Sequence, residues 1–197
     1  PDTSNEENLL QLKNEIKKNR SRIGFAYDGD GDRIVVLKNN GDVIWPDQLM
    51  ILFSRNILRD NKNAKIVYDI KCTKYLEEEI LKNDGIPVLS RTGHSFIKKA
   101  MINQKALLGG EMSGHIFFAD KWDGFDDGIY ASIRLLEMLS DHETYEEILN
   151  DLPISVTTPE INIPFSGNNH FTFMKLFAKL TKFDNASIID IDGLKII

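Results

Sequence analysis

Three aspartates, Asp28, Asp30 and Asp32, alternate with glycines in the sequence YDGDGDRI. Glycine can take backbone angles that other residues avoid, and this freedom lets the three carboxylates converge. Carboxylates so close together repel one another, and a divalent cation that prefers oxygen ligands removes that repulsion. The alternative, a solvated acidic turn, does not need such a regular alternation. The spacing therefore predicts a cation site.

The residues that follow the aspartates indicate which cation is expected. A helix-loop-helix calcium loop has glycine at its sixth position and glutamate at its twelfth, where this chain has Arg33 and Asn39. Mg²⁺ keeps few protein carboxylates and shares its other positions with phosphate oxygens, and an arginine stabilises a phosphoryl group during transfer. We therefore expect Mg²⁺ at the aspartates and a phosphate beside Arg33.

A second segment whose side chains could bind a ligand is LLGGEMSGH, which places Glu111 and Ser113 among glycines just after a predicted strand. Proteins of the α/β class bind ligands at such strand ends. A carboxylate and a hydroxyl displayed there can hydrogen-bond a polyol. An ordinary glycine-rich turn is equally compatible with this segment.

Two further segments follow predicted strands. In SRTGHSF, Gly93 and His94 stand where a helix begins, so backbone amides and an imidazole could face an anion. A helix cap or a surface histidine is the plainer interpretation. In YDIKCT, Lys71 could contact phosphate or be solvated, and Cys72 is expected to be a small packed residue rather than a nucleophile.

Strand-like and helical patterns alternate along most of the chain, which is typical of an α/β domain whose helices lie on the faces of a sheet. The aspartates lie in a tight loop between the first two strands, and Asp126 or Asp127 could cap a later helix. The expected strands are 23–28, 34–37, 64–69, 86–90 and 106–110, and the expected helices are 6–19, 46–58, 73–82, 95–102, 127–139 and 145–149.

The composition narrows the classes of partner. The 197 residues are 42% hydrophobic and 27% charged, with a net charge of −6, so we expect no nucleic-acid partner. The single cysteine excludes an internal disulfide, and no apolar run has the length of a membrane span, so we expect no membrane partner and, by default, a cytoplasmic location.

The pattern changes after Asp151. Residues 155–163 alternate like a strand, 171–180 are expected to form a helix, and 187–197 resemble the first part of a hairpin. The chain starts without a methionine and stops in an apolar run. We interpret it as a fragment of a longer protein.

Taken together, AYDGDGDRI, YDIKCT, RTGHSFIKKAM and GEMSGHIFF resemble the α-D-phosphohexomutase superfamily, and within it the bacterial phosphomannomutase/phosphoglucomutase branch. KWDGFDDGIYASIRLLEML and TPEINI continue the similarity over nearly the whole chain. The resemblance implies that 46–154 form the third, sugar-binding domain, with a mixed sheet flanked by helices on both faces. It also implies that 1–45 end the second domain and carry the metal loop, and that 155–197 are a truncated α+β start of the fourth.

The resemblance further implies an isomerase. A phosphoserine on the first domain would donate its phosphoryl group to a mannose or glucose phosphate, and a bisphosphorylated sugar would reorient and return its other phosphate. The implied roles are Mg²⁺ binding by Asp28, Asp30 and Asp32, assistance to phosphoryl transfer by Arg33, sugar binding by Glu111 and Ser113, proton transfer or phosphate contact by His115 and secondarily His94, and ligand contact by Lys71, Thr92 and Gly93.

Two family features are missing from this sequence. It has no serine loop of the TASHNP kind, and it stops before the phosphate-gripping loop of the fourth domain. We therefore expect the polypeptide to be inactive alone and to need the missing domains as partners. A non-catalytic module that binds metal or sugar phosphate remains an alternative, as does a phosphatase with an aspartate nucleophile.

Overall fold

A computed structural model describes residues 5–140, 145–153, 161, 163–167, 169–183 and 185–197. The chain forms two compact units, Pro1–Pro153 and Ile154–Ile197. Within the described ranges, no helix combines the length and the apolar character needed to cross a membrane. The predicted domain boundaries at residues 45 and 154 remain predictions.

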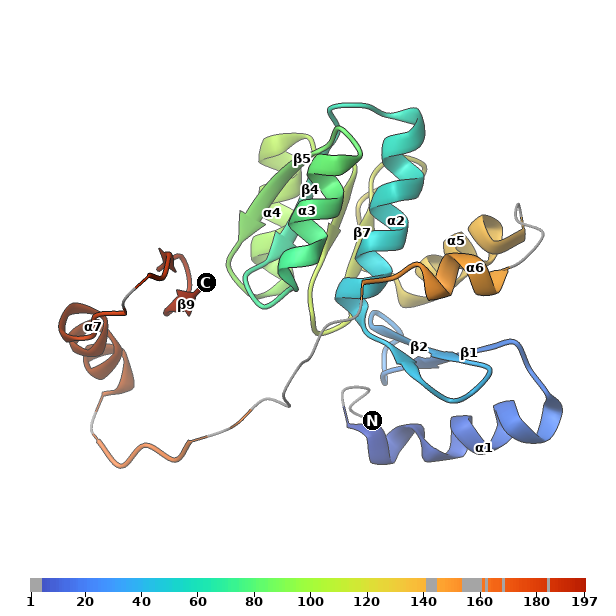
Figure 1. Ribbon diagram of the computed structural model, residues 1–197, viewed down its shortest axis with the longest axis horizontal. Coiled ribbons are helices and arrows are strands. Elements are labelled where there is room, and N and C mark those ends of the chain that lie inside the picture. Colours follow the sequence, from blue (N-terminus) through green and yellow to red (C-terminus); the bar gives the residue numbers. More distant parts are fainter. Residues whose placement is uncertain (1–4, 141–144, 154–160, 162, 168, 184) are drawn as a thin grey trace. The chain divides into compact units, whose positions relative to one another are not determined.

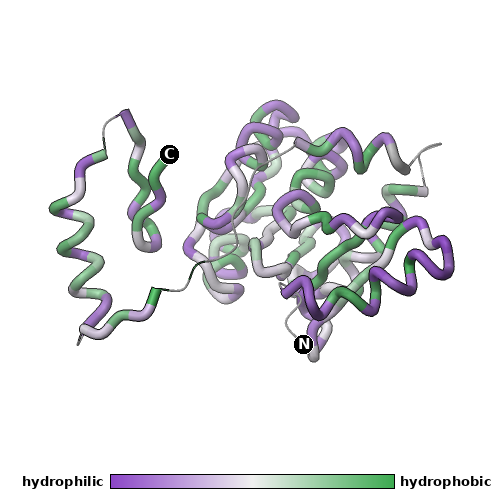
Figure 2. Tube along the Cα trace, turned by 60° about the horizontal axis from the view of Figure 1, so that its bottom comes forward, coloured by the Kyte–Doolittle hydropathy of each residue, from purple (hydrophilic) through white to green (hydrophobic). Residues whose placement is uncertain are grey.

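The first unit begins with a small antiparallel sheet that carries the aspartate loop. Strands β1 (Ile23–Tyr27), β2 (Ile34–Lys38) and β3 (Val43–Ile44) pair in the order β1-β2-β3. The preceding 3₁₀ helix η1 (Glu6–Leu9) and helix α1 (Leu10–Asn19) pack Leu9 and Ile16 against Val35 and Leu37. Figure 2 shows hydrophobic and hydrophilic residues alternating along α1, as expected for a helix with one buried face.

A four-stranded mixed sheet forms the centre of the first unit (Figure 1). Its strand order is β5-β4-β6-β7, in which β4 pairs in parallel with β5 and β6, and β7 is antiparallel to β6. The strands are β4 (Lys65–Asp69), β5 (Ile86–Ser90), β6 (Leu108–Gly110) and β7 (Ile116–Phe118), and the helices are α2 (Pro46–Asp60), α3 (Lys74–Lys82), α4 (His94–Gln104), α5 (Gly128–Ser140) and α6 (Tyr145–Asn150).

Helices cover both faces of this sheet. Successive side chains of a strand point to opposite faces, and β4 follows this rule. Ile66 and Tyr68 belong to the core that contains the apolar side chains of α2 and α3. Val67 packs instead with Ile97 and Met101 of α4. The predicted mixed sheet with helices on both faces is therefore confirmed.

The second unit contains helix α7 (His170–Leu180) and a pair of two-residue antiparallel strands, β8 (Ile188–Ile189) and β9 (Lys195–Ile196). The side chain of Asn169 accepts a hydrogen bond from the amide of Thr172 and caps the helix. The predicted helix and hairpin are present. The predicted strand 155–163 falls largely outside the described residues.

Helix α5 buries a different face from the one its apolar pattern suggests. Ile129, Ile133 and Leu136 stand at helical spacing, yet they are about half exposed. The buried face contains Ala131 and Leu135 instead, together with polar residues. The start of α5 docks on the aspartate loop through a hydrogen bond from the amide of Gly128 to the carbonyl of Gly31, and Gly128 belongs to the buried face.

Candidate functional site

The aspartate loop closes the hairpin between β1 and β2, where Tyr27 pairs with Ile34. The side chains of Asp28, Asp30 and Asp32 each offer a carboxylate oxygen, and these oxygens lie within 4.8 Å of one another. Gly31 has a φ of 78°, which glycine adopts without strain. The alternation of aspartate and glycine thus gathers three negative charges at the tip of a hairpin.

Arg33 is paired with the first of these aspartates. Its Nε lies 2.6 Å from Oδ2 of Asp28, and its backbone amide donates to Oδ1 at 3.1 Å. Burial alone would raise the pKa of Asp28, whose side chain is 3% exposed, but the hydrogen bonds and the charge of Arg33 lower it to about 2. Asp28 is therefore ionised at neutral pH.

Asp32 is in the opposite electrostatic situation. Burial raises its pKa, His115 opposes the rise, and the negative charges of Asp28 and Asp30 add to it. Its Oδ1 is buried and has no hydrogen-bond partner among the described residues. A buried carboxylate oxygen without a partner, beside two further carboxylates, is suited to a hard cation that prefers oxygen ligands. The residues present therefore fit Mg²⁺.

His115 connects this loop to the glutamate segment. Its Nδ1 lies 3.0 Å from Oε2 of Glu111 and 2.9 Å from Oγ of Ser113, and its Nε2 lies 3.4 Å from Oδ2 of Asp32. Burial alone would lower the pKa of His115, but the hydrogen bond to Glu111 and the charges of Asp32, Glu111 and Asp126 raise it. The imidazole therefore holds a proton more readily than a free histidine does.

Glu111 in turn connects to the third segment. It follows β6, its side chain is 2% exposed, and its Oε1 accepts a hydrogen bond from the amide of Gly93. Gly93 precedes α4 with a φ of 125°, and a Cβ there would lie 3.1 Å from the ring of Phe96. Glycine at this position lets the loop turn so that its amide meets the carboxylate.

His94 begins α4 and lies beside His115, with ring centroids 5.3 Å apart in a stacked arrangement. Its Nδ1 is 3.0 Å from Oδ2 of Asp126. Asp126 was expected as one of two possible helix caps, but Asp127 takes that role, since its Oδ1 accepts from the amide of Tyr130 at 2.8 Å. Asp126 is thus a site residue that sequence reasoning missed.

The remaining predicted residues lie at the carboxyl edge of the parallel strands. Lys71, which has an exposed side chain, follows β4, and Thr92 follows β5. Asp69 joins the loops at this edge, because its carboxylate accepts hydrogen bonds from Cys72, Thr92 and the amide of Met112. Asp69 is fully buried, and burial raises its pKa. Its position directly at the end of a strand was the signal that could have identified it.

Cys72 is packed, as expected. Its thiol lies 3.0 Å from Oδ1 of Asp69 and is buried. Burial and the nearby carboxylate raise its pKa well above the ordinary value, so the reactive thiolate is disfavoured.

Backbone contacts hold the aspartate loop against the rest of the first unit. The amide of Gly128 donates to the carbonyl of Gly31 at 3.0 Å, and the amide of Ile34 donates to the carbonyl of Gly114 at 3.1 Å. The hydroxyl of Tyr27 donates to Oγ of Ser132 at 2.8 Å. The loop is therefore fixed by both the glutamate segment and helix α5.

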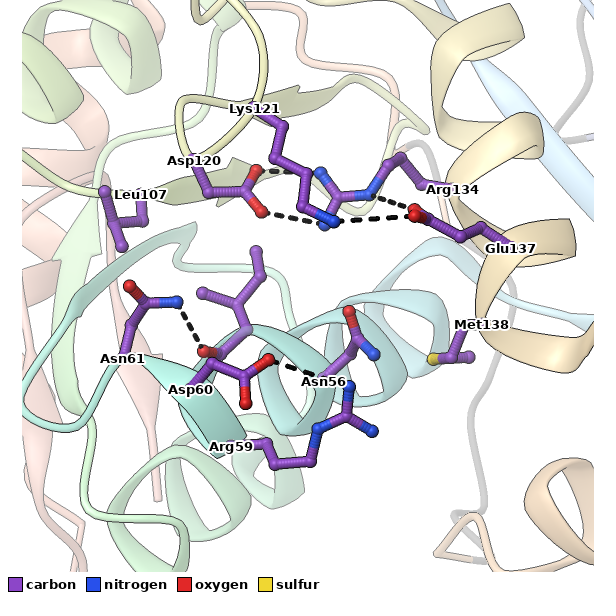
Figure 3. Close-up of a pocket in the computed structure, with 11 residues that line it drawn as sticks. Asn56, Arg59, Asp60, Asn61, Leu107, Asp120, Lys121, Arg134, Glu137 and Met138 are labelled. Carbon is purple, nitrogen blue, oxygen red and sulfur yellow. Dashed lines mark hydrogen bonds and ion pairs between the residues drawn. The ribbon is translucent and has the colours of Figure 1, made fainter. Parts of the chain in front are cut away.

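A pocket of about 340 Å³ lies elsewhere in the first unit (Figure 3). Its lining includes Leu107, which precedes β6, whereas Glu111 follows that strand. Arg134 in its wall is paired with both carboxylate oxygens of Asp120 at 2.7 and 2.8 Å. The pocket thus lies toward the amino end of β6, whereas the loops described above follow the carboxyl ends of the strands.

Comparisons with known proteins place these observations in a family. A family model described as phosphoglucomutase/phosphomannomutase, alpha/beta/alpha domain III, matches residues 45–155. The chain is 46% identical over 199 residues to a phosphoglucomutase of Neisseria meningitidis serogroup A, and 43% identical over 197 residues to a phosphomannomutase/phosphoglucomutase of Pseudomonas syringae pv. tomato. Both alignments cover 100% of this chain, and 43% and 42% of those relatives.

A solved structure agrees with the sequence relatives. A phosphoglucomutase/phosphomannomutase family protein from Burkholderia thailandensis superimposes with a TM-score of 0.93 at 40% identity, over 100% of this chain and 42% of that one. The chain spans less than half the length of the relatives it matches. The matched domain, the relatives and the fold together establish that the chain belongs to the phosphoglucomutase/phosphomannomutase family.

Proposed function

We propose that this chain forms the metal-binding and sugar-binding part of a phosphohexomutase that moves phosphate between the 1- and 6-positions of a hexose through a phosphoserine and a bisphosphorylated intermediate. The observation that carries the proposal is the position of His115, which contacts Asp32 and Glu111 and stacks on His94. Three segments with different predicted tasks thereby meet at one place.

In this proposal Asp28, Asp30 and Asp32 hold Mg²⁺, with the buried Oδ1 of Asp32 as one ligand. When bound, Mg²⁺ would neutralise charge on the phosphoryl group during transfer. Arg33, which is paired with Asp28, would stabilise the same phosphoryl group with its positive charge. A phosphoserine outside these 197 residues would complete the site.

The sugar would be held by the glutamate segment. Each carboxylate oxygen of Glu111 has a protein contact, to Gly93 or to His115, and keeps a second lone pair for a sugar hydroxyl. Ser113 adds a hydroxyl at the same place. Because Glu111 holds Nδ1 of His115, Nε2 is the atom that exchanges a proton with the substrate.

His94, Lys71 and Thr92 complete the ligand contacts in this proposal. The amides at the start of α4 and the imidazole of His94 would face a phosphate, because the amino end of a helix favours anions. Lys71 supplies a further positive charge at the same edge of the sheet. The missing domains of the longer protein would close over these groups.

The test is a mutase assay of the full-length gene product on glucose 1-phosphate and mannose 1-phosphate. Asp30→Asn should abolish turnover, whereas Asp60→Asn, an exposed aspartate at the far end of α2, should not change it. Full turnover by the Asp30→Asn protein would refute the metal assignment.

The 197-residue chain alone should show no turnover, and multiple turnovers by it would refute the need for the missing domains. Phosphate release that Asp28→Asn abolishes would favour the phosphatase alternative.

A further inference from the structure

His94, His115 and Asp126 form a cluster of their own beside the aspartate loop. Each offers one ligand atom, and the three atoms lie within 4.8 Å of one another. They come from separate places in the chain: His94 begins α4, His115 precedes β7, and Asp126 precedes α5. We propose that this histidine cluster is a second cation site, which binds a transition-metal ion such as Zn²⁺.

The aspartate cluster and the histidine cluster offer different ligand atoms and would therefore bind different cations. Two imidazole nitrogens and one carboxylate oxygen are a ligand set typical of Zn²⁺, which favours nitrogen and tetrahedral coordination and leaves its fourth position to water or a ligand. Three carboxylates suit Mg²⁺, which has little affinity for imidazole. The histidine cluster should therefore discriminate strongly against Mg²⁺.

The surroundings of the histidines support this assignment. In zinc sites a ligating histidine commonly donates its other ring nitrogen to a carboxylate, which fixes the tautomer. Glu111 makes this contact with Nδ1 of His115 at 3.0 Å, so Nε2, which lies 3.4 Å from Oδ2 of Asp32, is the nitrogen proposed to coordinate the ion. Nδ1 of His94 and Oδ2 of Asp126, the atoms proposed to bind the ion, lie 3.0 Å apart.

Occupation of this site has a consequence that rests on the proposed function. His94 and His115 are the groups proposed to contact the sugar phosphate, so a bound Zn²⁺ would withdraw both from that task. Micromolar Zn²⁺ should then inhibit the full-length enzyme without displacing Mg²⁺ from the aspartates. Metal binding itself does not depend on the mutase proposal.

The experiment is calorimetric titration of the 197-residue chain with ZnCl₂. Asp30→Asn is used as the background so that the aspartate loop contributes little. We expect one Zn²⁺ per chain, and a loss of at least about tenfold in affinity for His94→Ala and for Asp126→Asn. The matched control is His170→Ala, which removes an exposed histidine from α7 in the other unit and should change nothing.

A second readout keeps folding and binding apart. His94 is 61% exposed, so its removal takes away little packing, and circular dichroism should be unchanged. In NMR spectra, Zn²⁺ should shift the ring resonances of His94 and His115 and leave those of His170 in place. The proposal is overturned if His94→Ala and Asp126→Asn bind Zn²⁺ as tightly as the background protein, or if His170→Ala weakens binding equally.

Discussion

The close approach of α5 to the aspartate loop gives a prediction whose size follows from the structure. A Cβ built on Gly128 would lie 2.8 Å from the carbonyl oxygen of Arg33, and 2.9 Å from both the carbonyl carbon of Arg33 and the carbonyl oxygen of Gly31. All three are backbone atoms, so no side chain can rotate away. Overpacking of this kind costs about 1–3 kcal/mol, and loss of the Gly128–Gly31 hydrogen bond adds roughly 0.5–1.5 kcal/mol. Gly128→Ala should therefore lower the free energy of unfolding by about 1.5–4.5 kcal/mol.

Urea unfolding followed by tryptophan fluorescence measures this change. Both tryptophans, Trp45 and Trp122, lie in the first unit, so the signal reports on that unit. The matched control is Gly29→Ala in the same loop, because a Cβ there meets nothing within 4 Å. It should change the unfolding free energy by less than about 1 kcal/mol. Equal stability of Gly128→Ala and Gly29→Ala would refute the inference that close packing of α5 on the aspartate loop stabilises the first unit.

Three other substitutions test the fold around the site. Asp127→Ala removes the cap on the amide of Tyr130 and should cost about 1 kcal/mol in urea unfolding. Glu79→Gln should cost about 1–2 kcal/mol at pH 7, because Glu79 accepts a charged hydrogen bond from Arg55 at 2.6 Å. That bond lowers the pKa of Glu79, so its stabilisation is fully present above the ordinary pKa of 4.5 and is lost progressively as the pH falls below that value. A stability difference between the two proteins that does not shrink as the pH is lowered below 4.5 would contradict this. Leu52→Ala opens a cavity in the core and should cost about 2–5 kcal/mol.

The elements that local sequence determines were largely predictable. Apolar runs such as IVVL and helical patterns such as KYLEEEILK form β2 and α3 because burial follows the period of each element. The aspartate loop was predictable for a similar reason, since alternating glycines and a hairpin act over a few residues. The short strands β3 and β7 were not predicted, because two or three residues carry too little periodicity.

The contacts that complete the site depend on docking between distant segments. Asp126 and Asp127 are adjacent and chemically identical, and only the position of α4 decides that Asp126 faces His94. The buried face of α5 also depends on packing between distant segments. The apolar pattern of Ile129 and Ile133 gives no information on which neighbour the helix meets. Residue type and period specify each element, whereas tertiary packing specifies which side chains meet.

The hydroxyl contact between Tyr27 and Ser132 joins residues that are 105 positions apart. Ribosomes add roughly 5–20 residues per second. The hairpin with the aspartates is therefore synthesised about 5 to 20 seconds before the helix that supports it. During that interval the nascent hairpin has neither the Gly128 amide nor the Ser132 hydroxyl as a partner. The order of translation therefore makes the geometry of the aspartate loop a late event, which follows completion of the sheet domain.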